Sequence, residues 1–171
     1  MKSRLISLSA LVALVAIACA TVFVPQDMTI TRGSIVSGNL FSLSSSDNDR
    51  LVIKSGIKAT IYDNPIDFQS QVVCGQPNPT SMTLRLETSA STVGLVEYVE
   101  MFNWTTNRFE EVYQGPISRN ETARQIPVPN GGRFTGNVGQ MRVRYWVDQK
   151  HPVATIKWTV AIDELTWDVN F

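Results

Sequence analysis

The feature that most constrains the fold is a two-residue alternation of apolar and polar side chains. It is cleanest over residues 141–147, whose odd-numbered positions are all apolar: Met141, Val143, Tyr145 and Val147. The even-numbered positions between them carry Arg142, Arg144 and Trp146. Because successive side chains of a strand point to opposite faces of its sheet, this pattern predicts a strand with one buried and one outer face.

Similar runs recur about every eight to twelve residues with turn residues between them, which is typical of a β-sandwich or jelly roll. The strands that we expect cover residues 28–33, 34–38, 51–54, 59–62, 68–73, 81–87, 93–104, 109–113, 121–126, 141–147 and 155–169. Prolines around residues 121–126 predict an edge strand there. We therefore predict an all-β fold, an antiparallel, jelly-roll-like β-sandwich that residues 136–171 close.

Residues 93–104 and 109–113 are the best hairpin candidate in the chain. A short polar turn, residues 105–108, joins them, and we expect a bulge near Gly94. Trp104 and Phe109 flank the turn, so we expect their rings to pair across the two strands.

The N-terminus has the pattern of a helical signal peptide. Lys2 and Arg4 precede an apolar run over residues 5–18, and small residues around Cys19 predict cleavage before Thr21. The run is shorter than the roughly 20 residues of a membrane span. We therefore predict a signal peptide over residues 1–20, a single domain over 21–171, and a secreted, cell-surface or periplasmic protein.

A lipoprotein attached to the membrane through Cys19 is the alternative interpretation of this N-terminus. The residue three positions before the cysteine is Ala16, where a larger aliphatic side chain would favour lipidation. The cleaved signal is therefore the preferred prediction.

Charge and cysteine content exclude some classes of function. The 171 residues carry 15 basic and 15 acidic side chains, and loss of Lys2 and Arg4 with the signal leaves 13 basic and 15 acidic, a net charge of −2. Duplex nucleic acid is bound through clustered lysines and arginines, which this chain lacks. Cys74 is the one cysteine left after cleavage, so no internal disulfide can form.

No catalytic constellation is visible. The candidate nucleophile Cys74 and the lone His151 stand in different predicted loops, whereas a cysteine nucleophile needs an adjacent base. Glycosidase chemistry needs two carboxylates at a set separation, and the available pairs are Glu97 with Glu100 and Glu110 with Glu111. A hydrolase is therefore the least favoured function class, and we predict a protein that is not an enzyme.

Basic side chains suggest one candidate binding surface. Arg142 and Arg144 share a face, and with Arg85 and Lys157 they would form a basic strip that contacts carboxylates or an anionic polysaccharide through arginine forks. The alternative is an ordinary solvated sheet face, whose arginines are balanced by acidic neighbours: Glu87, Glu97 and Glu100.

Trp104, Tyr113 and Trp146 are candidates for stacking on a sugar ring. The alternation places Trp146 beside the arginines, which makes it the strongest of the three. Core or cross-strand packing is the commoner role of tryptophan in a sandwich.

Asp47 and Asp49 are candidate ligands of a structural calcium ion, because hard cations bind clustered oxygen atoms. The segment lacks the glycine and distal glutamate of an EF-hand loop. Aspartate and asparagine also form local turns in many loops, and this is the alternative interpretation.

Several short motifs occur in an order that resembles a known group of modules. They are Thr31-Arg32-Gly33 with Val36-Ser37-Gly38, residues 46–51, residues 99–104, residues 139–144, residues 158–163 and Trp167. The set is similar to β-sandwich modules of unknown function in secreted proteins of planctomycetes and related environmental bacteria. The resemblance implies an extracytoplasmic, non-catalytic sandwich and brings no ligand or catalytic residue with it.

These observations predict a secreted module that binds an extracellular or cell-surface partner, with carbohydrate or a surface protein as the candidate ligand. The alternative is a structural, self-assembling protein of the cell envelope that pairs through its edge strands. The oligomeric state, the ligand and the source are not determined by the sequence.

Overall fold

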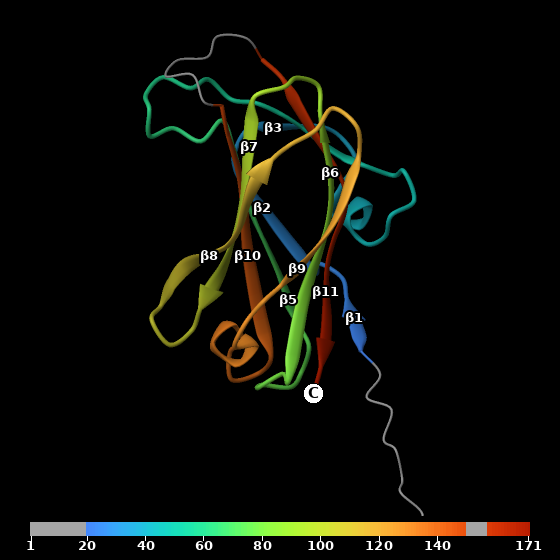
Figure 1. Cartoon of the computed structure of the whole chain (residues 1–171), viewed down its shortest axis with the longest axis vertical. Coiled ribbons are helices and arrows are strands. Elements are labelled where there is room, and N and C mark those ends of the chain that lie inside the picture. The colour runs from blue at the N-terminus through green and yellow to red at the C-terminus, as the bar shows by residue number, and fades with distance from the viewer. Residues whose placement is uncertain (1–19, 150–156) are drawn as a thin grey trace, which may run out of the picture.

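The computed structural model describes residues 20–149 and 157–171 (Figure 1). Residues 1–19 of the predicted signal peptide, which include Cys19, lie outside the described residues, as do His151 and the first two residues of the strand predicted over 155–169. Within the described residues, no helix is long and apolar enough to cross a membrane.

The regular elements of the described chain are β-strands and two short 3-10 helices. In chain order, the strands are β1 (Thr21–Phe23), β2 (Asp27–Arg32), β3 (Ser34–Ser37), β4 (Leu51–Lys54), β5 (Ile66–Val73), β6 (Ser81–Ala90), β7 (Leu95–Asn103), β8 (Arg108–Pro116), β9 (Thr122–Pro127), β10 (Gln140–Gln149) and β11 (Thr159–Asn170). The 3-10 helices are η1 (Leu40–Leu43) and η2 (Gly131–Phe134).

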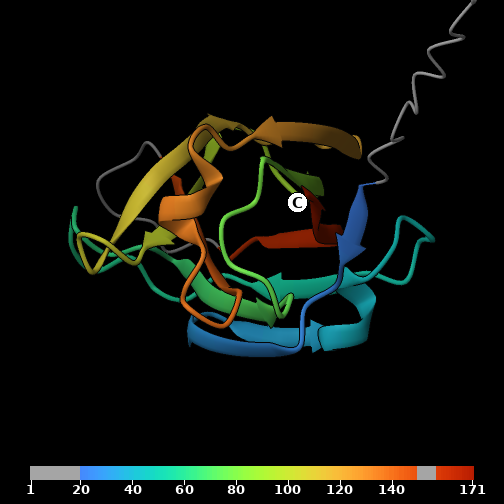
Figure 2. The same cartoon turned by 90° about the horizontal axis from the view of Figure 1, so that it is seen from below.

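The strands form two antiparallel sheets, which confirms the predicted sandwich (Figures 1 and 2). The five-stranded sheet has the order β2-β5-β10-β7-β8. The six-stranded sheet has the order β3-β4-β11-β6-β9, and β1 pairs with the far part of β11. The two segments predicted to close the sandwich, β10 and β11, therefore lie at the centres of the two sheets, and β9 lies at an edge as expected.

The alternation in β10 separates core from surface as predicted. Met141, Val143, Tyr145 and Val147 are fully buried, while Arg142, Arg144 and Trp146 are half-buried on the outer face. β11 contributes the largest buried side chain of the opposite sheet, Trp167. The buried apolar side chains of both sheets form one continuous core.

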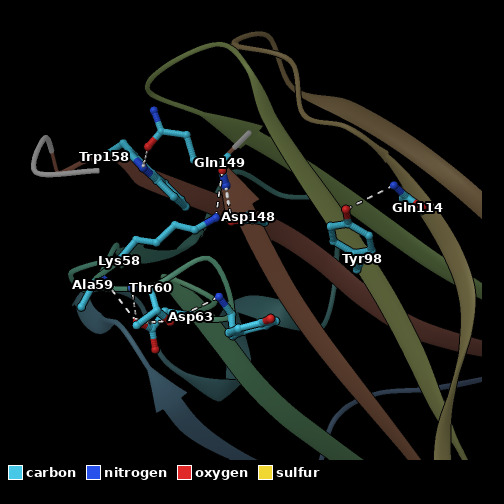
Figure 3. Close-up of polar contacts among 10 residues, drawn as sticks. Lys58, Ala59, Thr60, Asp63, Tyr98, Gln114, Asp148, Gln149 and Trp158 are labelled. Atoms are coloured by element: carbon cyan, nitrogen blue, oxygen red, sulfur yellow. Dashed lines mark hydrogen bonds and ion pairs between the residues drawn. The ribbon is translucent and has the colours of Figure 1, made fainter. Parts of the chain in front are cut away.

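The predicted strand over residues 59–62 is wrong. These residues form a turn because the Asp63 carboxylate accepts hydrogen bonds from the backbone N–H groups of Ala59 and Thr60, at 3.1 and 2.8 Å. The buried Lys58 ties this loop to the end of β10 through an ion pair with Asp148 and a 3.0 Å hydrogen bond to the Gln149 carbonyl (Figure 3).

The predicted hairpin exists, but its aromatic pairing is different. Phe102 lies opposite Phe109. Trp104 lies beyond the end of β7, and its backbone N–H donates to the Arg133 carbonyl at 2.9 Å. Gly94 lies in the turn before β7 with a φ of 79°, so it is not a bulge. The register shift of this hairpin lies between Val99 and Glu100.

One carboxylate lies between the two sheets. Glu97 is 0% exposed, and its Oε2 accepts hydrogen bonds from Tyr145 at 2.9 Å and from Thr88 at 3.0 Å. The Nη1 atom of Arg124 lies 3.1 Å from its Oε1. Burial raises the pKa of Glu97, and the Arg124 charge and the two hydroxyl donors oppose this shift only in part.

We expect Glu97 to make the stability of the fold depend on pH. The pKa of Glu97 in the folded protein lies above the ordinary value of 4.5. The contribution of Glu97 to the free energy of unfolding is therefore fully present below pH 4.5 and is lost as the pH rises through the folded pKa. Urea unfolding between about pH 4 and pH 8 measures this slope. Glu97→Gln should flatten it, whereas Glu111→Gln, at an exposed position of β8, should not; equal slopes in both variants would contradict the assignment.

Gly139 directly precedes β10 and has a backbone conformation and surroundings that leave no room for a side chain. Its φ is 76°, and a Cβ there would lie 2.7 Å from the Cys74 sulfur and from the backbone nitrogens of Gly75 and Gln76. We expect Gly139→Ala to lower the free energy of unfolding by about 2 kcal/mol or more, through backbone strain and crowding together.

Gly75→Ala is the matched control, because Gly75 has a φ of 80° but no atom lies within 4 Å of the position that a Cβ would take. It isolates the backbone strain, which we expect to cost about 1 kcal/mol. Equal losses in the two variants would show that the close approach at Gly139 has no energetic effect.

Candidate functional site

The outer face of the five-stranded sheet holds the largest group of polar and aromatic side chains that the sequence pointed to. Strand register arranges them in three cross-strand rows, each named here after its β10 residue. The Trp146 row contains Asp67, Trp146, Tyr98 and Gln114. The Arg144 row contains Thr29, Gln69, Arg144, Glu100 and Glu111. The Arg142 row contains Asp27, Gln71, Arg142, Phe102 and Phe109.

Arg144 is held by two carboxylates. Its Nε and Nη2 atoms donate to the two oxygens of Asp67 at 3.0 and 2.5 Å, and its Nη1 donates to Glu100 at 3.2 Å. These contacts, the Asp67 hydrogen bond first, raise the pKa of Arg144. The guanidinium therefore has few donors left for a ligand, and its main effect is to fix the neighbouring strands and side chains.

Trp146 stacks on a cross-strand neighbour. The ring centroids of Trp146 and Tyr98 lie 3.6 Å apart and the ring planes differ by 4°. One face of the indole is therefore covered. The Tyr98 hydroxyl accepts a 3.2 Å hydrogen bond from Gln114 (Figure 3), and burial is the main cause of the raised pKa of Tyr98.

Arg142 makes fewer polar contacts than Arg144. Its Nε donates to Gln71 at 3.3 Å, and within the described residues its Nη atoms make no hydrogen bond or ion pair. Its guanidinium carbon lies 5.7 Å from the centroid of the Phe102 ring and 5.6 Å from the centroid of the Trp104 ring. Both distances are within the range of a cation–π contact.

A shallow depression of about 190 Å³ adjoins Arg142. Every residue that lines it is polar or charged: Asp27, Thr29, Gln69, Ser70, Gln71 and Arg142. The depression thus offers acceptors, hydroxyl and amide groups and unpaired guanidinium donors next to the aromatic cluster of Phe102, Phe109 and Trp104. This combination of directional polar groups and apolar ring edges suits a ligand rich in hydroxyl groups.

The predicted basic strip does not form. Arg85 lies on β6 in the six-stranded sheet, where it pairs with Asp168 at 2.5 Å, whereas Arg142 and Arg144 lie on the opposite sheet. Lys157 precedes β11 and is exposed. Alternation correctly predicted that each arginine points outward. Arg85, however, points away from Arg142 and Arg144, because they lie on the outer faces of opposite sheets.

The other aromatic candidates have packing contacts. Trp104 is half-buried, with its ring edge-on to Phe102 at 5.0 Å and packed against Gly136. Tyr113 packs against the core, and the centroid of its ring lies 5.8 Å from the Arg124 guanidinium carbon. Only Trp104 therefore contributes to the outer face that carries Arg142.

The acidic candidates are also placed by the structure. The exposed Asp47 accepts hydrogen bonds from the Asp49 N–H at 2.9 Å and the Ser45 hydroxyl at 2.8 Å, and these bonds lower its pKa. Asp47 and Asp49 as calcium ligands remain a prediction. Glu97 points into the core and Glu100 to the outer face, so this pair does not share a cleft.

Sequence reasoning missed the outward residues of β5: Asp67, Gln69 and Gln71. Their alternation with buried Ile66, Phe68 and Ser70 was the available signal. Their position beside Arg142 and Arg144 depends on the pairing of β5 with β10, about 70 residues later in the chain. Such a distant pairing leaves no local mark in the sequence.

No protein-family model and no curated protein matches this chain. Its fold is similar to that of a variant family 29 carbohydrate-binding module complexed with cellulohexaose, at 13% identity and a TM-score of 0.50, over 90% of this chain and 93% of that chain. It is also similar to TmCBM61 in complex with β-1,4-galactotriose, at 10% identity and a TM-score of 0.49, over 82% and 86% of the two chains.

A further similar structure is the N-terminal cellulose-binding domain of a β-1,4-glucanase from Cellulomonas fimi, at 14% identity and a TM-score of 0.47, over 75% of this chain and 81% of that chain. At such identities the likeness concerns the fold. The resemblance to modules of planctomycetes remains a prediction.

We expect Arg144→Met to lower the free energy of unfolding by about 2 kcal/mol, because it leaves the Asp67 carboxylate, 6% exposed, without its cation. Arg142→Met is the matched control and should cost less than about 0.5 kcal/mol, since no ion pair is lost. Urea unfolding measures both. Similar losses in the two variants would contradict a structural role for the Arg144 pair.

Proposed function

We propose that this protein is a secreted, non-catalytic module that binds a glycan on the outer face of its five-stranded sheet. The observation that carries the proposal is the Arg142 row. There a polar depression lies next to aromatic rings and to Arg142 Nη donors that make no hydrogen bond to other described residues. The sandwich fold, shared with a carbohydrate-binding module whose structure contains cellulohexaose, supports the same class of ligand.

The residues assigned to the ligand differ in their roles. Arg142, Gln71 and Asp27 would exchange hydrogen bonds with sugar hydroxyls, and Trp104 would offer an apolar ring edge beside them. Trp146 has one ring face covered by Tyr98, so it would contact a sugar through its other face or its edge. Arg144 would position the neighbouring strands and would touch the ligand little.

The charge of this face favours a neutral glycan over a polyanion. Asp67 and Glu100 already neutralise Arg144, and Asp27 lines the same depression as Arg142. A uronic acid or sulfate would meet these carboxylates at close range. Neutral hydroxyl groups, in contrast, pair equally well with donors and acceptors.

Self-assembly is the second candidate function, and one edge strand favours it. β3 is exposed along its whole length, and Ile35 and Val36 are 45% and 59% exposed. An exposed apolar edge can pair with another strand. Light scattering after size exclusion distinguishes the two functions, because a strict monomer at high concentration argues against assembly.

We expect titration calorimetry with cello-, manno- and galacto-oligosaccharides to detect binding to at least one series. Arg142→Ala should weaken that binding at least about tenfold, as truncation of a central arginine contact does. Arg85→Ala, on the opposite sheet, is the matched control and should leave the affinity unchanged. Absence of binding across the panel, or equal loss in both variants, would overturn the proposed site.

A further inference from the structure

We propose that Glu87, Glu121 and Asp163 bind a calcium ion on the outer side of the six-stranded sheet, beneath the loop of residues 44–50. The three carboxylates come from β6, from the residue before β9, and from β11. One oxygen atom of each lies within 4.8 Å of the other two. Two oxygens on opposite sides of one calcium ion are about 4.6–5.2 Å apart, so a single ion can bridge all three.

Burial of Asp163 is a second, independent observation that indicates a ligand. Asp163 is 1% exposed, and its Oδ1 is buried with no hydrogen-bond partner among the described residues. Its Oδ2 accepts a 3.1 Å hydrogen bond from the Asn48 N–H. A buried carboxylate oxygen without a donor is costly unless a cation or another partner compensates it.

A bulge in β11 creates this position. The pairing of β11 with β6 shifts register between Ile162 and Glu164, and Asp163 is the additional residue. The loop that follows η1 covers it, because Ser44 bridges to Glu164 and Asn48 bonds to Asp163. The carboxylate is therefore enclosed between the sheet and the loop.

The protein supplies too little positive charge for the three carboxylates. The one ion pair that the described residues give them joins Arg50 Nη2 to Glu121 Oε2 at 2.7 Å. The other oxygen of Glu121, Oε1, is buried without a hydrogen-bond partner among the described residues. One guanidinium against three carboxylates leaves two negative charges, which a divalent cation would neutralise.

The donor set favours calcium over other ions. All three ligands are carboxylate oxygens, whereas zinc and copper sites are built from histidine and cysteine. Magnesium requires a near-ideal octahedron of oxygens at about 2.0–2.1 Å and gives up its water reluctantly, so it is seldom bound by a site built from protein ligands alone. Calcium accepts six to eight oxygens in flexible geometry, so water would complete its shell.

This site is independent of the proposed glycan face, because the two lie on opposite sheets. A bound ion would join β6, β11 and the residue before β9, and it would hold the loop of residues 44–50 indirectly, through the contacts of Asn48 with Asp163 and of Arg50 with Glu121. The loss of calcium binding would therefore appear as a change in stability, without any glycan being present.

The test is a calorimetric titration of the chelator-treated, full-length mature protein with calcium chloride, with a parallel measurement of Tm. We expect one saturable site and a Tm that rises with calcium concentration. Glu87→Gln and Asp163→Asn should each weaken binding at least about tenfold, as a lost contact at a metal site does. Glu87 is half-buried, so its variant keeps the test valid if the Asp163 variant does not fold.

Glu111→Gln is the matched control, because it removes an exposed carboxylate on the opposite sheet, and it should bind calcium like the wild type. Absence of both heat and a Tm shift in the wild-type protein at millimolar calcium would overturn the proposal. So would wild-type affinity in Glu87→Gln, and an equal response to magnesium would overturn the assignment to calcium.

Discussion

The structure depends on the shared burial of the inner faces of β10 and β11, the central strands of its two sheets. Each strand has neighbours on both sides, so its inner side chains lie far from either sheet edge. Tyr145 and Trp167 are fully buried there and belong to the same core. Burial of each such ring contributes on the order of 2–3 kcal/mol. The outer side chains of β10 are fixed in direction by this burial, which makes the outer face a surface of defined shape.

Glu97 is a buried carboxylate in that core, and its directional contacts fix how one sheet lies over the other. A purely apolar interface tolerates small slips of one sheet over the other, since its contacts are not directional. Glu97 reaches Tyr145 on its own sheet and Thr88 and Arg124 on the opposite one. A slip of one sheet over the other would move Thr88 and Arg124 away from this buried carboxylate, which is far more costly than a shifted methyl contact.

Sequence patterns predicted the class of fold and the face on which most residues lie. They succeeded for β10 because each local alternation reports directly on burial. They failed to assign Arg85 and Arg142 to different sheets, because strand order depends on pairings between segments far apart in the chain. They also gave no sign of the bulge that buries Asp163, since one extra residue in a strand leaves the composition unchanged. The candidate surfaces were therefore predictable residue by residue, but not as groups.

The pairing of β1 with β11 has a consequence for how this sandwich can be joined to other chains. Thr21 lies opposite Val169, and the Phe23 ring meets the Phe171 ring edge-on at 6.5 Å. Both ends of the described chain thus lie at the same end of the molecule (Figure 1). Domains placed before and after this one would emerge side by side, and the sandwich could be inserted into a surface loop of a host protein or circularly permuted with a short linker.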